Sequence, residues 1–192
     1  MPRPMRQKAR QVTDPALICA MLDGMETIFI GMHDEPAPYV VPVNFGYTFD
    51  GDLTFYFHCA QKGYKLELLE KNPHVSVTAA SFISYAEGSV KGHLHDYRSV
   101  MARGVARRID AQSEPEEFDR AHRLLLAHNH RVFMPEDVPF MPLIQLWRID
   151  CRAEDVTAKA EIVPCSAEEV AFAPAVPDGS GLDESHILGE RG

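Results

Sequence analysis

The stretch YVVPVNFGYTFDGDLTFYFH, residues 39–58, decides the fold class. It is rich in β-branched and aromatic residues, which favour strands, and it contains an Asp-Gly pair of the kind that closes hairpins. We therefore expect a β-hairpin over 39–58 with its turn at 49–52. Pro42 has no amide hydrogen, so its strand should lie at an edge, carry a bulge or have an interrupted ladder.

A helix is expected next, at about 61–71, because Asn72-Pro73 would end it. Lys62 and Lys65 fall near its first turn, where the helix dipole disfavours cations, and Gly63 lets a ligand approach the backbone closely. A phosphate bound at the helix start would attract both the positive end of the dipole and the two lysines, so the lysines would then be favourable there. Ordinary solvated lysines on a helix that starts elsewhere explain the same pattern, so the residues alone leave both interpretations open.

His58 ends the second strand and also has two interpretations. It could project into a cleft and shuttle protons to a cofactor or substrate, because histidine titrates near neutral pH. It could equally be a partly buried histidine held by a hydrogen bond. Cys59 beside it is interpreted as a small buried hydrophobe rather than as a redox centre.

The rest of the chain is expected to be mainly β with peripheral helices. Helices are predicted at 13–24, capped by Thr13 or Asp14 and ended by Gly24, and at 113–130, with Ser113 as cap and Glu116 completing a capping box. The apolar stripe of the second helix should be Phe118, His122, Leu125 and Leu126. Further strands are predicted at 27–32, 74–81, 97–110, 143–151 and 156–163, with a bulge or bend at Gly104 and a loop over 82–94. Short connections and hairpins favour an antiparallel barrel or sandwich.

Composition sets further limits. The chain has 192 residues and a formal net charge of −9, which argues against general nucleic-acid binding. No apolar run approaches membrane-spanning length, no secretory signal is recognisable, and the four cysteines form no CxxC pair, so we expect a cytoplasmic protein with reduced thiols. His93 and His95 could share one strand face, but solvated histidines are the favoured interpretation, so no metal site is predicted. Residues 1–163 should form one domain, followed by an acidic Pro/Ala/Gly-rich tail over 164–192.

Three segments in this order and spacing resemble a known family: VVPVNFGY, FYFHCAQKGYKLELLEKNPHV and DYRSVMARGVARRI. They are similar to the FMN-binding split-barrel proteins related to pyridoxamine 5′-phosphate oxidase, and more narrowly to the nitroimidazole-resistance (Nim-type) branch. The resemblance covers roughly residues 5 to 160. It implies a six-stranded antiparallel split β-barrel that forms a homodimer, with FMN in clefts at the subunit interface.

The resemblance also implies roles for individual residues. Lys65 is the best candidate to bind the flavin phosphate, and His58 is the proposed reactive group near the flavin. The other implied flavin contacts are Cys59, Lys62 and Gly63 around the phosphate, Pro42, Val43, Asn44 and Phe45 against the ring, and Ser99 and Val100 from the partner subunit.

The function implied is an FMN-dependent oxidoreductase that takes electrons from a nicotinamide or other donor and reduces a small acceptor, such as a nitroaromatic compound. VVPVNFGY has no basic residue, and the C-terminal Trp and Arg segment of the vitamin B6 oxidases is not recognisable, so pyridoxamine phosphate oxidation is not expected. Two alternatives stay open. The barrel could bind the deazaflavin F420 or haem, or the protein could be a non-catalytic flavin-binding or redox-sensing module.

Overall fold

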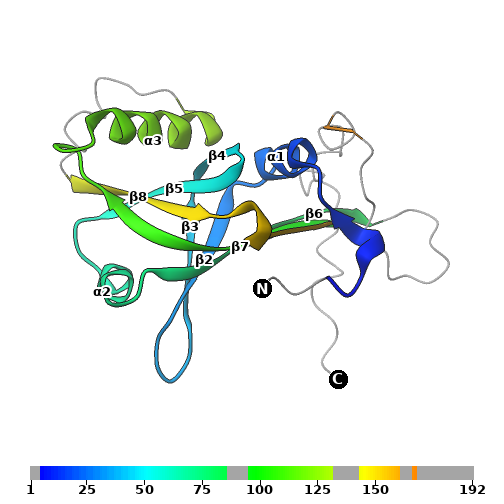
Figure 1. Cartoon of the computed structure of the whole chain (residues 1–192), viewed down its shortest axis with the longest axis horizontal. Coiled ribbons are helices and arrows are strands. Elements are labelled where there is room, and N and C mark those ends of the chain that lie inside the picture. Colours follow the sequence, from blue (N-terminus) through cyan, green and yellow to red (C-terminus); the bar gives the residue numbers. More distant parts are fainter. Residues whose placement is uncertain (1–4, 86–94, 132–142, 161–165, 168–192) are drawn as a thin grey trace, which may run out of the picture.

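The computed structural model describes residues 5–85, 95–131, 143–160 and 166–167. Within them, the strands join into one antiparallel sheet that curls into a barrel, and helices lie around it (Figure 1). The strands are β1 (Gln11–Val12), β2 (Thr27–Met32), β3 (Tyr39–Asn44), β4 (Gly46–Asp50), β5 (Asp52–Ala60), β6 (His74–Tyr85), β7 (His95–Ile109), β8 (Ile144–Cys151) and β9 (Val156–Ala160). The helices are α1 (Pro15–Asp23), α2 (Tyr64–Lys71) and α3 (Pro115–His128). The predicted fold class is confirmed, with short strands β1 and β9 adding to the central ones.

The strand order explains why the barrel is split. Neighbouring strands follow the order β3-β2-β6-β7-β8-β5-β4, with β9 beside β7 and β1 beside β9. Only Phe45 separates β3 from β4 in the chain, yet these strands stand at opposite ends of the order. The two ends of the sheet must therefore return to each other. β3 and β5 come into contact there, and the described part of the sheet has no strand pairing between them.

The hairpin predicted over 39–58 is wrong in its first strand. β4 and β5 do pair across Gly51, whose φ of 72° suits the Asp-Gly turn. β3 instead pairs with β2, because the run breaks at Phe45, where the ring turns into the core and is fully buried. Both halves have strand composition, so no residue type marked the break. Pro42 lies on β3 at the end of the strand order, as its missing amide hydrogen requires.

The long strand β7, in which a bulge or bend was predicted at Gly104, changes its neighbour there. On one side, residues 98–102 of β7 pair with β9, whereas residues 105–109 pair with β8. A Cβ on Gly104 would stand 2.6 Å from the carbonyl oxygen of Asp150 and from the sulfur of Cys151. The ladder with β6 runs through Gly104 without a shift, and its irregularity lies between residues 82 and 84. Gly104 therefore allows β7 to lie close to β8 and does not form a bulge.

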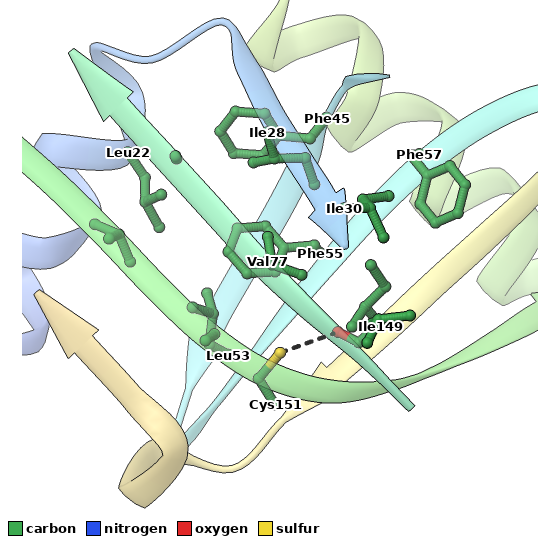
Figure 2. Close-up of a cluster of buried hydrophobic side chains, with 14 of the residues drawn as sticks. Leu22, Ile28, Ile30, Phe45, Leu53, Phe55, Phe57, Val77, Ile149 and Cys151 are labelled. Atoms are coloured by element: carbon green, nitrogen blue, oxygen red, sulfur yellow. Dashed lines mark hydrogen bonds between the residues drawn. The ribbon is translucent and has the colours of Figure 1, made fainter. Parts of the chain in front are cut away.

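Alternation along β5 decides which side chains fill the barrel. Phe55 and Phe57 point into the main core, where Figure 2 shows them with Phe45 and the aliphatic side chains of β2 and β6. The rings of Phe45 and Phe55 meet edge to face, with centroids 5.7 Å apart. Tyr56 points the other way, into a second buried cluster beneath α3. By the same alternation His58 lies on the α3 side of the sheet.

α3 covers the outer face of β4, β5 and β8 (Figure 1). Its buried residues are Ala121 and Leu125, and Phe118 packs beside them. The predicted stripe is therefore correct for Phe118 and Leu125, but His122 is half-buried and faces a cleft rather than the core. The helix lies close enough to β4 that a Cβ on Gly46 would stand 2.6 Å from the backbone of α3.

The helix starts differ from the predictions in two places. Glu114, and not Ser113, caps α3, and it makes no side-chain cap bond. The Ser113 hydroxyl donates to Asp110 at 3.0 Å, which closes a turn before the helix, so the predicted capping box is absent. α2 begins only at Tyr64, after Gly63. For α1, Asp14 accepts from the amide of Ala16 at 2.9 Å, as predicted.

Other predictions fall on segments that need correction or lie outside the described residues. β6 continues to Tyr85, into the segment expected as a loop, and the two-residue strand β1 was not predicted. His93, most of the proposed tail over 164–192 and the end of the strand predicted at 156–163 lie outside the described residues.

Candidate active-site cleft

A cleft of about 430 Å³ opens beside the split in the barrel, between the ends of β3 and β5 and the C-terminal half of α3. Its apolar wall is formed by Leu125, Leu126 and Ile144. Its polar lining residues are Glu26, Asn44, Asn129, His58, His122 and the pair His130-Arg131. Clefts of this size suit small-molecule ligands, and the mixture of apolar wall and convergent polar groups is typical of such sites.

His58 faces this cleft from the end of β5. Its side chain remains accessible to solvent, yet the surrounding atoms exclude enough water to lower the pKa of His58 below its usual value. The positive charges of Lys65, His122 and Arg131 lower that pKa further. The imidazole is therefore neutral in most molecules at pH 7, and a negative charge nearby would favour its protonated form.

The end of α3 brings two basic residues to the cleft. His130 has a positive φ of 53°, its amide donates to the carbonyl of Ala127, and the amide of Arg131 reaches back to Leu126 at 2.9 Å. These two bonds form a Schellman-type helix end, which normally favours glycine at the left-handed position. The turn directs His130 and Arg131 along the cleft instead of away from the barrel.

The start of α2 lies just beyond His58 in the chain. Gly63 has a φ of 153°, which side chains rarely permit, and no atom lies within 4 Å of the place where its Cβ would stand. No side chain caps the helix, so its first amide groups point outward. Lys62 is exposed, whereas Lys65 is half-buried with its amine 5.9 Å from the centre of the Phe57 ring. This open, glycine-lined helix start with two cations has the features of an anion site.

The connection between β5 and α2 is fixed to β8 by a chain of amide hydrogen bonds. Gln61 donates to the carbonyl of Ile144 at 2.8 Å, and Gln145 donates to the side-chain oxygen of Gln61 at 3.1 Å. The indole of Trp147 donates in turn to Gln145. These bonds hold the glycine turn in place relative to the strand ends that line the cleft.

The structure brings only some of the predicted site residues together. Asn44 and His58 line the cleft, and Lys62, Gly63 and Lys65 form the start of α2. The side chains of Phe45, Cys59 and Val100 are buried in the core, at 0%, 6% and 1% exposure, so a ligand could reach only their backbone. Val43 also packs partly against the core, whereas Pro42 faces outward.

An exposed apolar face adjoins the cleft at Asn44. One row across the sheet runs Pro42, Phe29, Thr78, Met101 and Thr157, each paired with the next. Four large apolar side chains stand on this face with 42% to 54% of their surface exposed: Phe29, Val40, Met101 and Val105. Ser99 stands on the same face, two residues from Met101. An apolar surface of this kind marks an interaction site more often than a solvated one.

Sequence reasoning missed the contribution of α3 to the cleft. His122 was assigned to the packing stripe, and the histidines and arginine at the end of the helix were not assigned to a site. A signal was present, because His122 is the one polar residue in that predicted stripe. Whether His122 faces the core or the cleft depends on how the helix lies on the sheet. The sequence does not give that orientation.

Other kinds of site lack support in the described residues. No three His, Cys, Asp or Glu side chains of this part of the chain gather in a group that could hold a metal ion. Cys19, Cys59 and Cys151 are free, and burial raises the pKa of the Cys151 thiol to about 12, which makes it unreactive. None of the helices described is long and apolar enough to cross a membrane.

Comparison with known proteins places the chain among related folds. Its residues 14–158 match the family model of pyridoxamine 5′-phosphate oxidase. No curated protein sequence matches the chain. Among solved structures, a candidate 5-nitroimidazole antibiotic resistance protein from Bacteroides thetaiotaomicron is 26% identical, with a TM-score of 0.61 over 78% of this chain and 86% of that chain.

Two more distant structures share the fold alone. The flavocytochrome Anf3 from Azotobacter vinelandii is 20% identical, with a TM-score of 0.59 over 94% of this chain and 89% of that chain. An FAD and heme binding protein from Mycobacterium smegmatis is 16% identical, with a TM-score of 0.60 over 93% and 96% of the two chains.

The family match runs from the cap of α1 into β9 and so includes every strand of the barrel except the short β1. The split barrel and the order of the three sequence segments agree with it. The chain belongs to the pyridoxamine 5′-phosphate oxidase family of split β-barrels.

Proposed function

We propose that the protein is an FMN-dependent oxidoreductase that reduces a small acceptor, such as a nitroaromatic compound. One observation carries the proposal: at the end of β5, a cleft-facing histidine is followed within seven residues by a glycine turn and two lysines at a helix start. The first feature suits proton transfer, and the second suits a phosphate. The similarity to a candidate 5-nitroimidazole resistance protein supports the choice of acceptor.

FMN suits the residues present. Lys65 and Lys62 would neutralise its phosphate. The amide groups after Gly63 would donate to the phosphate oxygens, because Gly63 has no side chain to keep the phosphate away from the backbone. Asn44 and Pro42 offer outward-facing positions next to the cleft for the ring. Pyridoxamine phosphate oxidation is a poorer fit, because β3 carries no arginine or lysine.

When bound and reduced, FMN would supply a hydride, which is the chemistry that this protein's own side chains lack. A nitro group that gains this hydride and one proton becomes a nitroso group and releases water. His58 would hold that proton at the cleft and donate it from an imidazole nitrogen. A nicotinamide donor would restore the reduced flavin by giving up a hydride of its own.

Reconstitution tests this proposal directly. The purified full chain is mixed with excess FMN, FAD, F420 or haem in separate samples, desalted, and scanned for retained cofactor absorbance. We expect retention of FMN, and we expect NADH or NADPH to bleach the flavin band and a nitroaromatic compound to restore it. Absence of retained FMN would overturn the proposal. Retained FMN that no donor bleaches would favour the non-catalytic alternative.

The proposal includes a homodimer with flavin at the subunit interface. The exposed apolar face supports it, because Phe29, Val40, Met101 and Val105 lie on one continuous surface of the sheet. That surface meets the cleft at Asn44, so a second copy docked on it would lie beside the flavin site. Ser99, which the family resemblance gives to the partner's flavin site, belongs to the same face.

Phe29→Glu should convert this dimer to a monomer. The substitution would place a carboxylate at the centre of the apolar row, where burial without a partner is costly. Sedimentation velocity at about 10 µM should show a dimer for the unmodified chain and a monomer for the variant. An interface of standard size should keep two copies associated at this concentration. Leu143→Glu, which changes an exposed apolar residue outside this face, should remain dimeric. A monomeric unmodified chain would contradict the interface.

A further inference from the structure

The turn that precedes α2 is tied to β8 by side chains as well as by the sheet. The ladder between β5 and β8 ends at the pair Ala60 and Ile144. Just beyond it, the side-chain nitrogen of Gln61 donates to the carbonyl of Ile144 at 2.8 Å. The side-chain nitrogen of Gln145 donates to both the backbone carbonyl and the side-chain oxygen of Gln61, at 3.3 and 3.1 Å. These bonds hold the chain against β8 where it leaves the sheet.

The direction of these bonds is fixed at both ends. The indole N–H of Trp147 can only donate, and it donates to the side-chain oxygen of Gln145 at 3.1 Å. The Gln145 nitrogen therefore faces Gln61, whose own oxygen must accept and whose nitrogen must donate. The carbonyl of Ile144, which can only accept, takes that last donor. Flipping either glutamine amide would set donor against donor, so one arrangement alone satisfies the whole set.

Trp147 is also connected to the lysine of the same helix start. Its indole, which is 5% exposed, stacks on the Phe57 ring with the centroids 6.4 Å apart. The amine of Lys65 stands 5.9 Å from the centre of that same Phe57 ring. One buried indole thus supports both parts of the candidate phosphate site, the glycine turn through its N–H and the lysine through the neighbouring ring.

We propose that Gln61, Gln145 and Trp147 are positioning residues for the flavin phosphate, which keep the turn at Gly63 in its binding conformation before the ligand arrives. A glycine turn that was free to move would lose its conformational freedom on binding, and affinity would fall accordingly. The inference rests on the proposed function, because the phosphate is that of FMN. It goes further by assigning the preference for FMN over riboflavin, which lacks the phosphate, to three side chains that act through the backbone.

Fluorescence titrations with FMN and riboflavin distinguish this role from a general role in folding. Gln145→Met keeps the length of the side chain but removes its bonds to the turn. It should weaken FMN binding at least about fivefold and riboflavin binding less than about twofold, because the phosphate alone depends on the order of the turn. Gln11→Met is the matched control, since Gln11 is an exposed glutamine on β1, and it should leave both affinities unchanged.

Two further variants test whether the three side chains act as one unit. Gln61→Met leaves the bond from Gln145 to the backbone carbonyl, so it should reduce the FMN preference less than Gln145→Met does. The double variant should lose about as much as Gln145→Met alone. Trp147→Phe keeps a ring beside Phe57 but removes the donor that orients Gln145, and it should reduce the preference at least about twofold.

Hydrogen exchange tests the order of the turn without any flavin. The amide of Leu66 donates to the carbonyl of Gly63 at 2.9 Å and closes the first turn of α2. In the flavin-free Gln145→Met variant this amide should exchange at least about threefold faster than in the unmodified chain. The amide of Asn72, which donates to Leu68 at the other end of α2, is the internal control and should keep its rate.

Each outcome bears on one of the two proposals. Equal losses of FMN and riboflavin affinity, an unchanged FMN preference in Gln145→Met, or unchanged exchange at Leu66 would overturn the inference while the proposed function stood. Absence of FMN binding by the unmodified chain would overturn the proposed function and the inference with it. If thermal melts show that Gln145→Met does not fold, Gln61→Met carries the same comparisons, because it leaves the Trp147 indole paired.

Discussion

Lys65→Ala should weaken FMN binding about 10- to 150-fold, because it removes a charged donor to a phosphate, worth about 1.5–3 kcal/mol. Lys65 is the stronger of the two lysine candidates. It lies in the first turn of α2 with its amine above the Phe57 ring, so its side chain is already partly ordered. Lys62 is fully on the surface and would lose more side-chain freedom on binding, so Lys62→Ala should have a smaller effect.

Fluorescence titration of FMN measures this effect, because flavin emission changes on binding. Lys71→Ala is the matched control, since Lys71 is an exposed lysine at the far end of the same helix. Equal losses of FMN affinity for Lys65→Ala and Lys71→Ala would contradict the assignment of the phosphate site to the start of α2. A melting temperature for Lys65→Ala close to that of the unmodified chain separates lost binding from lost folding.

His58→Gln should lower kcat/KM for nitroaromatic reduction about 100- to 10,000-fold, the usual contribution of a positioned proton donor. FMN affinity should change little, because His58 faces the cleft and not the start of α2. His74→Gln is the control, since His74 is exposed on β6 away from the cleft.

The pH profile distinguishes proton donation from a structural role for His58. Partial burial, together with Lys65, His122 and Arg131, lowers the pKa of His58, so the proton-donating form increases only as the pH falls below the usual histidine range. The rate should therefore rise on acidification and fall as the pH rises through that lowered pKa. His58→Gln should flatten this dependence. A variant that kept the slope would assign the titration to another group.

Most strands and helices were predictable because their signals are local, whereas the split barrel was implied only by the family resemblance. The Asp-Gly turn, the alternating aromatic run of β5 and the Asn-Pro stop after α2 each act within a few residues, and all three are found in the structure. The pairing of β3 with β2 was not predictable in the same way. It depends on the core accepting the Phe45 ring, which is a property of the assembled barrel.

The candidate site likewise has residues that are close in the chain and residues that only the packing of α3 brings together. His58 and the lysines of α2 lie close together in the chain, so a shared site was one open interpretation, and the family resemblance assigned their roles. His122 and Arg131 reach the same cleft from more than 60 residues away, through the position of α3 on the sheet. A propensity or a cap indicates that a helix exists, but packing against Tyr56 and Leu146 decides which face it turns to the cleft.

The close approach of α3 to Gly46 has a consequence for how such a cleft changes during evolution or engineering. The backbone at Leu124 and Leu125 occupies the space that any side chain at Gly46 would need. Residue 46 lines no part of the cleft, yet it acts as a spacer whose size fixes the distance between helix and barrel. Acceptor size could thus diverge among relatives through a residue that never touches the acceptor, and a search confined to lining residues would overlook it.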